Sequence, residues 1–265
     1  MDYAQARLQA RFGSRPVRAE WQRLDSIGEI GAFLEAAKRA GLGRWLAGLD
    51  EHAGMHRVEI ALRERLRDCI RELASWMPSN WQSAMLWTSH LVDLPALVHL
   101  ARGGSEVAWM RSDPVIGAYL SGNATDKRHA ILSAAQRKVL VVVGSANGKE
   151  GLPAGLPSGV AAALKAWTAL WLEMWPRRGS EERTSVTQLM HRVGAHLQAF
   201  ETASSTQDSP VLRRDLEEAL RRDLRRSTLL PGAAFAYLAI SALDLERVRS
   251  MILGRIGPGD TEQVP

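Results

Sequence analysis

Apolar residues recur every three or four positions from Met55 to Met77, and charged residues fill most of the positions between them. Residues at this spacing share one face of an α-helix, whereas a half-buried strand would show strict alternation. Pro78 follows directly and cannot continue a helix. The segment therefore predicts a long amphipathic helix that must pack its apolar face against other elements. That face carries Val58, Leu62, Leu66, Cys69, Ile70 and Leu73.

The same spacing along most of the chain predicts an all-α, multi-helical protein. Two segments begin with an Asp that can cap a helix and a Pro that the first turn tolerates, Asp93-Leu94-Pro95 and Asp113-Pro114. The run Val139–Val143 could form a strand or a helix, and both alternatives stay open. Other helices are expected over 3–11, 33–49 with an interruption at Gly41-Leu42-Gly43, 81–91, 158–175, 181–200, 211–226, and as a closing pair from Pro231 to Ile256.

The distribution of Gly and Pro predicts the boundaries of three helical lobes. The segment 144–159 is rich in both residues, which is typical of an exposed loop. We therefore expect an N-terminal lobe over 1–105, a middle lobe over 106–200 that contains this loop, and a C-terminal lobe over 201–265. The end of the last lobe should fray.

The charge of the chain limits the class of partner. Its 34 Lys and Arg against 29 Asp and Glu give a formal net charge of +5. Most of the excess is Arg interleaved with acidic residues, so it does not indicate nucleic acid and suits an acidic protein surface better.

The chain also lacks the apolar run that a membrane span requires. Its most apolar stretch, Val160–Trp175, is broken by Lys165 and Glu173, whereas a span needs about 20 apolar residues. Met1–Arg11 does not resemble a signal peptide. We expect a cytoplasmic protein that reaches a membrane only indirectly, through a partner.

Few residues are arranged as a catalytic or ligand site would need. The stretch Gly144–Gly151 resembles a phosphate-binding loop, but its glycine spacing is one residue short and Glu150 stands where a hydroxyl should bind magnesium. His52, His56 and Glu59 have metal-ligand spacing, yet Gly54 weakens their helix and no fourth ligand is evident. We expect no catalytic residue, no metal and no cofactor. The lone Cys69 is interpreted as a small core residue.

Two helical segments carry side chains that bind partners in other proteins. Trp167, Trp171 and Trp175 form an aromatic stripe, which we interpret first as core and second as an interface anchor. The segment from Val211 carries six arginines, partly paired at four-residue spacing by Glu217 and Glu218. These arginines are the candidate partner interface: Arg213, Arg214, Arg221, Arg222, Arg225 and Arg226.

Two stretches carry a family likeness. One runs from Leu230-Pro231 through Tyr237-Leu238 to Asp244–Arg255, and the other includes Tyr3–Arg7, Glu59 and Leu91–Arg102. Together they resemble the C-type subunit of archaeal and bacterial V/A-type ATPases, known as the d-type subunit in eukaryotes, and the chain is similar to a short, divergent bacterial member. In that family a Tyr-led helix is followed by an acidic turn and a second helix.

The resemblance implies a funnel-like arrangement of related helical lobes and a mechanical role. Such a subunit links the central stalk of the rotary ATPase to its proteolipid ring, and it passes torque for proton or sodium transport without hydrolysing ATP. Its partners would be the stalk subunits and the ring, with no nucleic acid. Two alternatives stay open: a helical scaffold or adaptor unrelated to rotary ATPases, and a small helical enzyme that uses a His and a carboxylate.

Overall fold

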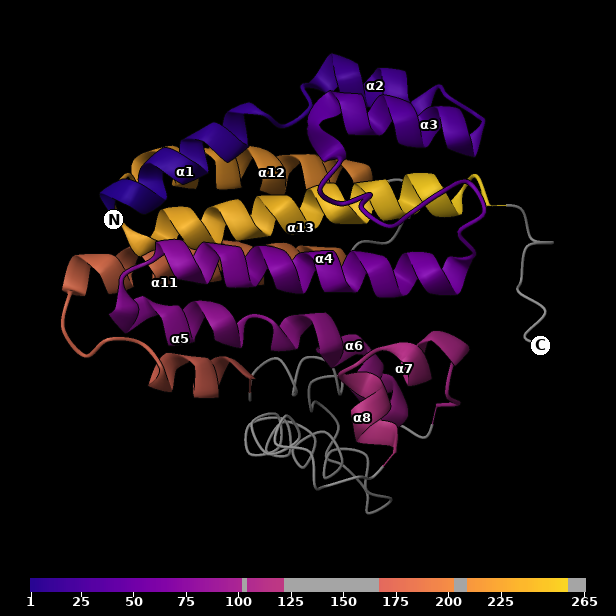
Figure 1. The fold of residues 1–265 in the computed structure, drawn as a ribbon. Coiled ribbons are helices and arrows are strands. Elements are labelled where there is room, and N and C mark those ends of the chain that lie inside the picture. Colours follow the sequence, from indigo (N-terminus) through magenta and orange to yellow (C-terminus); the bar gives the residue numbers. More distant parts are fainter. Residues whose placement is uncertain (102–103, 122–166, 203–208, 257–265) are drawn as a thin grey trace. The chain divides into compact units, whose positions relative to one another are not determined.

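The computed structural model describes residues 1–101, 104–121, 167–202 and 209–256 (Figure 1). Within these ranges every regular element is a helix, which confirms the all-α class predicted from the apolar spacing. The funnel-like arrangement stays a prediction. The chain divides into two compact units, one formed by Met1–Met85 with Pro176–Pro265 and the other by Leu86–Trp175.

The first unit contains most of the long helices. Its N-terminal part holds α1 (Asp2–Gly13), α2 (Arg18–Asp25), α3 (Ile30–Ala37), the π-helix η1 (Lys38–Leu42), α4 (Met55–Trp76) and α5 (Ser79–Trp87), the last of which continues into the second unit. Its C-terminal part holds α11 (Ser180–Thr202), α12 (Ser209–Arg226) and α13 (Pro231–Leu253).

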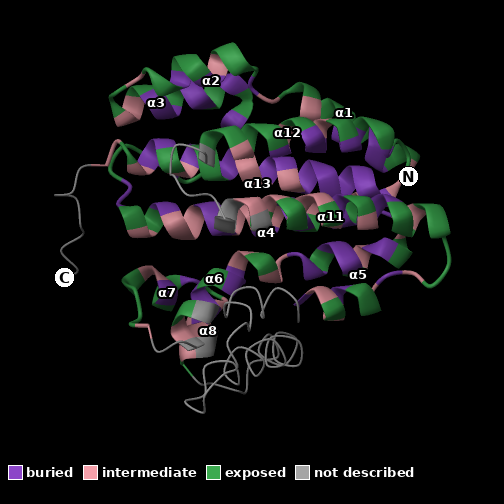
Figure 2. Ribbon diagram, turned by 180° about the vertical axis from the view of Figure 1, so that it is seen from behind, coloured by how far each residue is buried: buried purple, intermediate pink, exposed green. Residues whose placement is uncertain are grey.

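Helix α13 forms the centre of the first unit. It packs against α12, α11, α4 and α1, and Figure 1 shows it running between α12 and α4. Its first eight residues are all buried, as the continuous purple in Figure 2 indicates. A helix that is apolar all round belongs in a core. Pro231 stands at its first position, where a missing N–H costs nothing.

Sequence and structure differ at the ends of several helices. The predicted closing pair is one continuous helix, because no Gly or Pro interrupts α13 after Gly232. Asp244-Leu245 therefore lies inside a helix and forms no acidic turn. Helix α6 (His90–Ala101) begins before the predicted start at Asp93, so that Pro95 lies within it. Helices α2 and α7 (Ala108–Ser112) were not predicted.

The expected interruption near Gly41 is confirmed. Gly41 has a φ of 88°, and a Cβ there would lie 2.2 Å from the carbonyl oxygen of Ser14. Only glycine fits both the left-handed backbone and this close approach. The interruption lets the chain turn back toward the end of α1.

The second unit is small. Ala96, Leu97, Met110 and Ile116 form a buried cluster between α6, α7 and α8 (Ile116–Leu120). Asp113 lies just before α8, and its Oδ1 accepts the backbone N–H groups of Val115 and Ile116 at 2.9 and 3.1 Å.

The tryptophan stripe belongs to the second unit. Residues 167–173 are helical, and Trp167, Trp171 and Trp175 are each buried. Their ring centroids lie 5.0 and 5.2 Å apart in sequence order. The indole Nε1 of Trp87 donates to the carbonyl oxygen of Trp167 at 3.4 Å. The stripe is therefore a core element of this unit, as our first interpretation expected.

The two units group the chain differently from the three consecutive lobes 1–105, 106–200 and 201–265. Helices α1 and α4 pack directly on α13, so both ends of the chain share one core. Gly- and Pro-rich composition indicates where linkers lie along the chain. The division into units depends instead on which helices pack their apolar faces together, and these helices can be far apart in sequence. The run Val139–Val143 and the loop 144–159 lie outside the described residues.

Candidate partner-binding surface

Helix α12 presents one buried face and one charged face. Leu216, Ala219, Leu220 and Leu224 are buried at helical spacing, and they pack α12 against its neighbours α11 and α13. Asp223 is also buried, and it accepts two hydrogen bonds from Arg192 of α11, at 2.6 and 3.1 Å. The opposite face is therefore directed toward solvent, where it is green in Figure 2.

The structure separates the six candidate arginines into two groups. Arg221 is half-buried, donates to Glu217 at 2.7 Å and lies 6.0 Å from the centroid of the Phe12 ring. Burial lowers the pKa of the His196 imidazole, and the positive charge of nearby Arg213 lowers it further. Arg214 is exposed beside the neighbouring Asp215, at 3.8 Å. Arg213 and Arg221 thus already interact with neighbouring helices of the unit.

Arg222, Arg225 and Arg226 form the second group, which we call the outer arginines. They occupy positions i, i+3 and i+4, so they share one face of α12, and all three are exposed. Among the described residues, no carboxylate forms an ion pair with any of them. The predicted pair of Glu218 with Arg222 is not formed, whereas the pair of Glu217 with Arg221 is confirmed.

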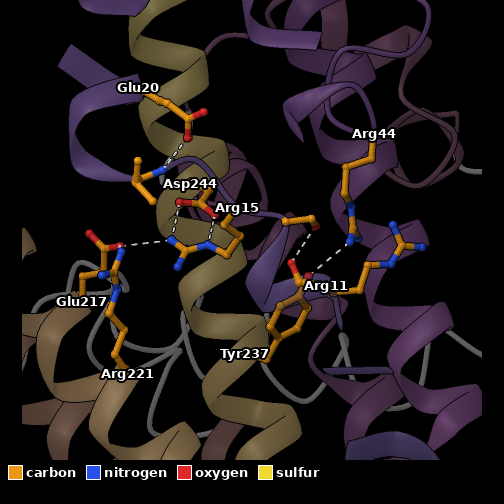
Figure 3. Close-up of polar contacts among 10 residues, drawn as sticks. Arg11, Arg15, Glu20, Arg44, Glu217, Arg221, Tyr237 and Asp244 are labelled. Carbon is orange, nitrogen blue, oxygen red and sulfur yellow. Dashed lines mark hydrogen bonds and ion pairs between the residues drawn. The ribbon is translucent and has the colours of Figure 1, made fainter. Parts of the chain in front are cut away.

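The inner edge of α12 joins a buried ion network around Arg15 (Figure 3). Arg15 lies between α1 and α2 and donates to both carboxylate oxygens of Asp244 on α13, at 2.5 and 2.6 Å. It also donates to Glu217 at 3.0 Å. Glu217 in turn accepts from Arg221, so positive and negative groups alternate along the network. The network connects the α1–α2 segment to α12 and α13.

The environment of this network determines its protonation. Burial opposes ionisation of Glu217, but the hydrogen bond from Arg15 and the charge of Arg221 overcome it and lower its pKa. Burial is the largest influence on Asp244 and raises its pKa, although Arg15 acts in the opposite direction. The guanidinium of Arg15 stays charged, because the two carboxylates compensate its burial and raise its pKa. The bidentate geometry indicates a charged pair at neutral pH.

A second polar cluster lies within about two turns of Asp244 on the same side of α13. Tyr237 and Ser241 are buried, and the hydroxyl of Tyr237 accepts from Arg44 at 3.4 Å. Burial raises the pKa of the neighbouring Cys69 thiol, so this cysteine stays protonated at neutral pH. Cys69 is therefore a buried residue of the core side of α4, as expected from its sequence context.

Sequence reasoning did not identify the Arg15–Asp244 pair. One signal was present, because Asp244 directly follows the uncharged and mostly apolar run Pro231–Leu243 of α13. An acid on an apolar helix predicts a buried cation. The sequence offers 34 candidates for that cation, and Arg15 stands more than 200 positions away, so its identity required the fold.

The other candidate ligand groups do not converge. His52 is exposed and lies 3.6 Å from Glu51, and no three His, Cys, Asp or Glu side chains within the described residues lie close enough to hold a metal ion. None of the described helices combines the length and apolarity needed to cross a membrane. The loop Gly144–Gly151, where no nucleotide is expected, lies outside the described residues.

A scan against protein-family models gave no match, and searches of curated proteins and of solved structures gave none either.

Proposed function

We propose that this chain is a non-catalytic, protein-binding component of a rotary V/A-type ATPase, linking the central stalk to the proteolipid ring. The resemblance of both terminal stretches to the C-type subunit of that family motivates the assignment. The observation that carries it is the outer face of α12, where three exposed arginines lack an acidic partner in the described part of the chain. A rigid cationic face of this kind suits an acidic protein surface.

The packing of α12 supports a mechanical role for this face. The inner side of α12 forms an ion pair with α11, between Asp223 and Arg192. It forms a second ion pair with the α1–α2 segment, between Glu217 and Arg15. A load applied to the outer arginines would pass into α13 and α11 through these contacts and the buried leucines. A subunit that transmits torque needs such a connection.

Co-purification with stalk and ring tests the proposal. Purified stalk subunits and ring should be retained by the wild-type chain at low salt and released as ionic strength rises, because exposed ion pairs are screened. If neither is retained at low salt, the coupling role is wrong.

A charge-reversal variant tests the contact surface itself. Replacing Arg222, Arg225 and Arg226 by Glu should weaken stalk binding while leaving the helix content unchanged. Arg221, a candidate from sequence, is kept because it also holds Glu217.

The matched control reverses three exposed arginines on α2 and η1, Arg18, Arg23 and Arg39, which form no ion pair with described residues. Both triple variants change the formal net charge equally. Equal loss of binding by the two variants would indicate a general charge effect and would exclude α12 as the specific surface.

A further inference from the structure

Leu229 is held in a conformation that leucine disfavours. It lies in the turn between α12 and α13 with a φ of 63°, and it is the one non-glycine residue of the described ranges with a positive φ. Gly and Asn are the usual residues in this left-handed region, because a side chain there approaches the following carbonyl oxygen. Its side chain is 47% exposed, so core packing does not explain why an apolar residue occupies this position.

Specific hydrogen bonds hold the turn in place. The backbone N–H of Leu229 donates at 3.1 Å to Oε1 of Gln5, a buried side chain of α1. The next N–H, of Leu230, donates to the carbonyl oxygen of Ser227 at 2.9 Å. The turn is thus bonded both internally and to a second helix. Leu229 is presented to solvent by a fixed backbone.

The neighbours of Leu229 identify the chemistry that would cover it. Arg225 and Arg226 form the exposed last turn of α12, immediately before the Leu229 turn. We propose that Leu229 and the outer arginines form one docking surface for an acidic amphipathic helix of a partner protein. In that complex the apolar stripe of the partner helix covers Leu229, and its flanking carboxylates pair with the outer arginines.

The composition of the surface favours a protein over nucleic acid. Asp215 and Glu218 are exposed on α12 among the arginines, and they would repel a continuous row of phosphates. An exposed leucine also contributes nothing to phosphate binding, whereas an apolar anchor within a charged rim is typical of protein interfaces. The inference rests on the proposed use of α12 but does not require that the partner be a rotary ATPase.

Peptide binding tests the inference directly. The probe is a synthetic helix of about 20 residues, long enough to span α12, with leucines along one face and glutamates flanking that face on both sides. A second peptide has the same composition but a scrambled order that destroys the apolar face. The wild-type chain should bind the amphipathic peptide at least about tenfold more tightly than the scrambled one, a difference of about 1.4 kcal/mol.

Substitutions at Leu229 separate binding from folding. Leu229→Asn should weaken binding of the amphipathic peptide about tenfold, yet shift the thermal midpoint by only a few degrees, because Asn tolerates the left-handed backbone. Leu229→Met should retain most of the affinity.

The control is Met55→Asn, an exposed apolar residue at the start of α4, which should bind as wild type. Met55 lies far from Leu229. The Glu59–Arg249 ion pair places the start of α4 beside Arg249, which is 18 residues along α13 from Pro231, whereas Leu229 lies just before Pro231. That separation corresponds to roughly 27 Å at the rise of an α-helix.

Three outcomes would overturn the inference. They are equal affinity for both peptides, unchanged binding by Leu229→Asn, and preferential binding of a single-stranded polyuridylate RNA. Failure of the stalk subunits to bind, combined with peptide binding that depends on Leu229, would instead reject the rotary assignment and retain this docking surface.

Discussion

Arg15 and the outer arginines of α12 carry the same side chain in opposite surroundings. The side chain of Arg15 is buried, and its guanidinium contacts carboxylates from two helices. Arg222, Arg225 and Arg226 are exposed and form no ion pair with a described residue. Removing one partner of a buried ion pair leaves the other charge unpaired and unsolvated, which costs much free energy. An exposed charge remains hydrated, so its removal costs little. Stability should therefore depend on the first region, and partner binding on the second.

Removing Arg15 should give the largest loss of stability. Arg15→Met leaves the Asp244 carboxylate buried without its cation and should lower the free energy of unfolding by about 3 to 5 kcal/mol. Denaturant unfolding followed by circular dichroism measures this change. The double variant with Asp244→Leu should recover most of the loss, because no buried charge is left unpaired. A loss below about 1 kcal/mol for Arg15→Met would show that the pair is solvated like a surface ion pair.

Glu217 occupies the border between the two regions and should give an intermediate effect. Glu217→Gln weakens the contacts with Arg15 and Arg221, so we expect a loss of about 1 to 2 kcal/mol at pH 7. Because the fold lowers the pKa of Glu217, its stabilisation is fully present above the ordinary pKa near 4.5 and disappears as the pH falls through the lowered value.

Unfolding at several pH values tests this assignment. The wild type and Glu217→Gln should therefore converge in stability below pH 4.5. A constant difference between them down to about pH 3 would contradict the assigned contacts.

The outer arginines should give the smallest effect on folding. Replacing Arg222, Arg225 and Arg226 together by Ala should cost about 1 kcal/mol or less, mainly through lost interaction with the C-terminal end of the helix dipole. Thermal unfolding at moderate salt measures the change. A loss as large as that of Arg15→Met would mean that these side chains stabilise the fold, and the contrast between the regions would be wrong.

The comparison also explains which parts of the structure the sequence could predict. The amphipathic spacing of α4 and α12 depends on neighbours three and four positions apart, so helices and their outward arginines followed from sequence alone. The Arg15–Asp244 pair and the placement of α13 at the centre depend on contacts between distant segments. The predicted closing helical pair was wrong for a different reason, since no Gly or Pro interrupts the chain after Gly232 and Asp244 does not end a helix.

The Leu229 turn was also beyond sequence analysis. A leucine with positive φ carries no signal in the sequence, because residues at such positions are normally recognised as Gly or Asn. Only the backbone angle and the hydrogen bond from Leu229 N–H to Gln5 identify it.

The salt dependence of stalk binding is the most direct test of the division between the two regions. Affinity of purified stalk subunits would be measured over a range of ionic strengths for the wild type and for the Arg222→Glu, Arg225→Glu and Arg226→Glu triple variant. We predict that the wild-type affinity falls steeply with salt, while the variant binds weakly and depends little on salt, with a thermal midpoint lowered by only a few degrees. Identical salt dependence for both proteins would contradict the account, because the outer arginines would then take no part in binding.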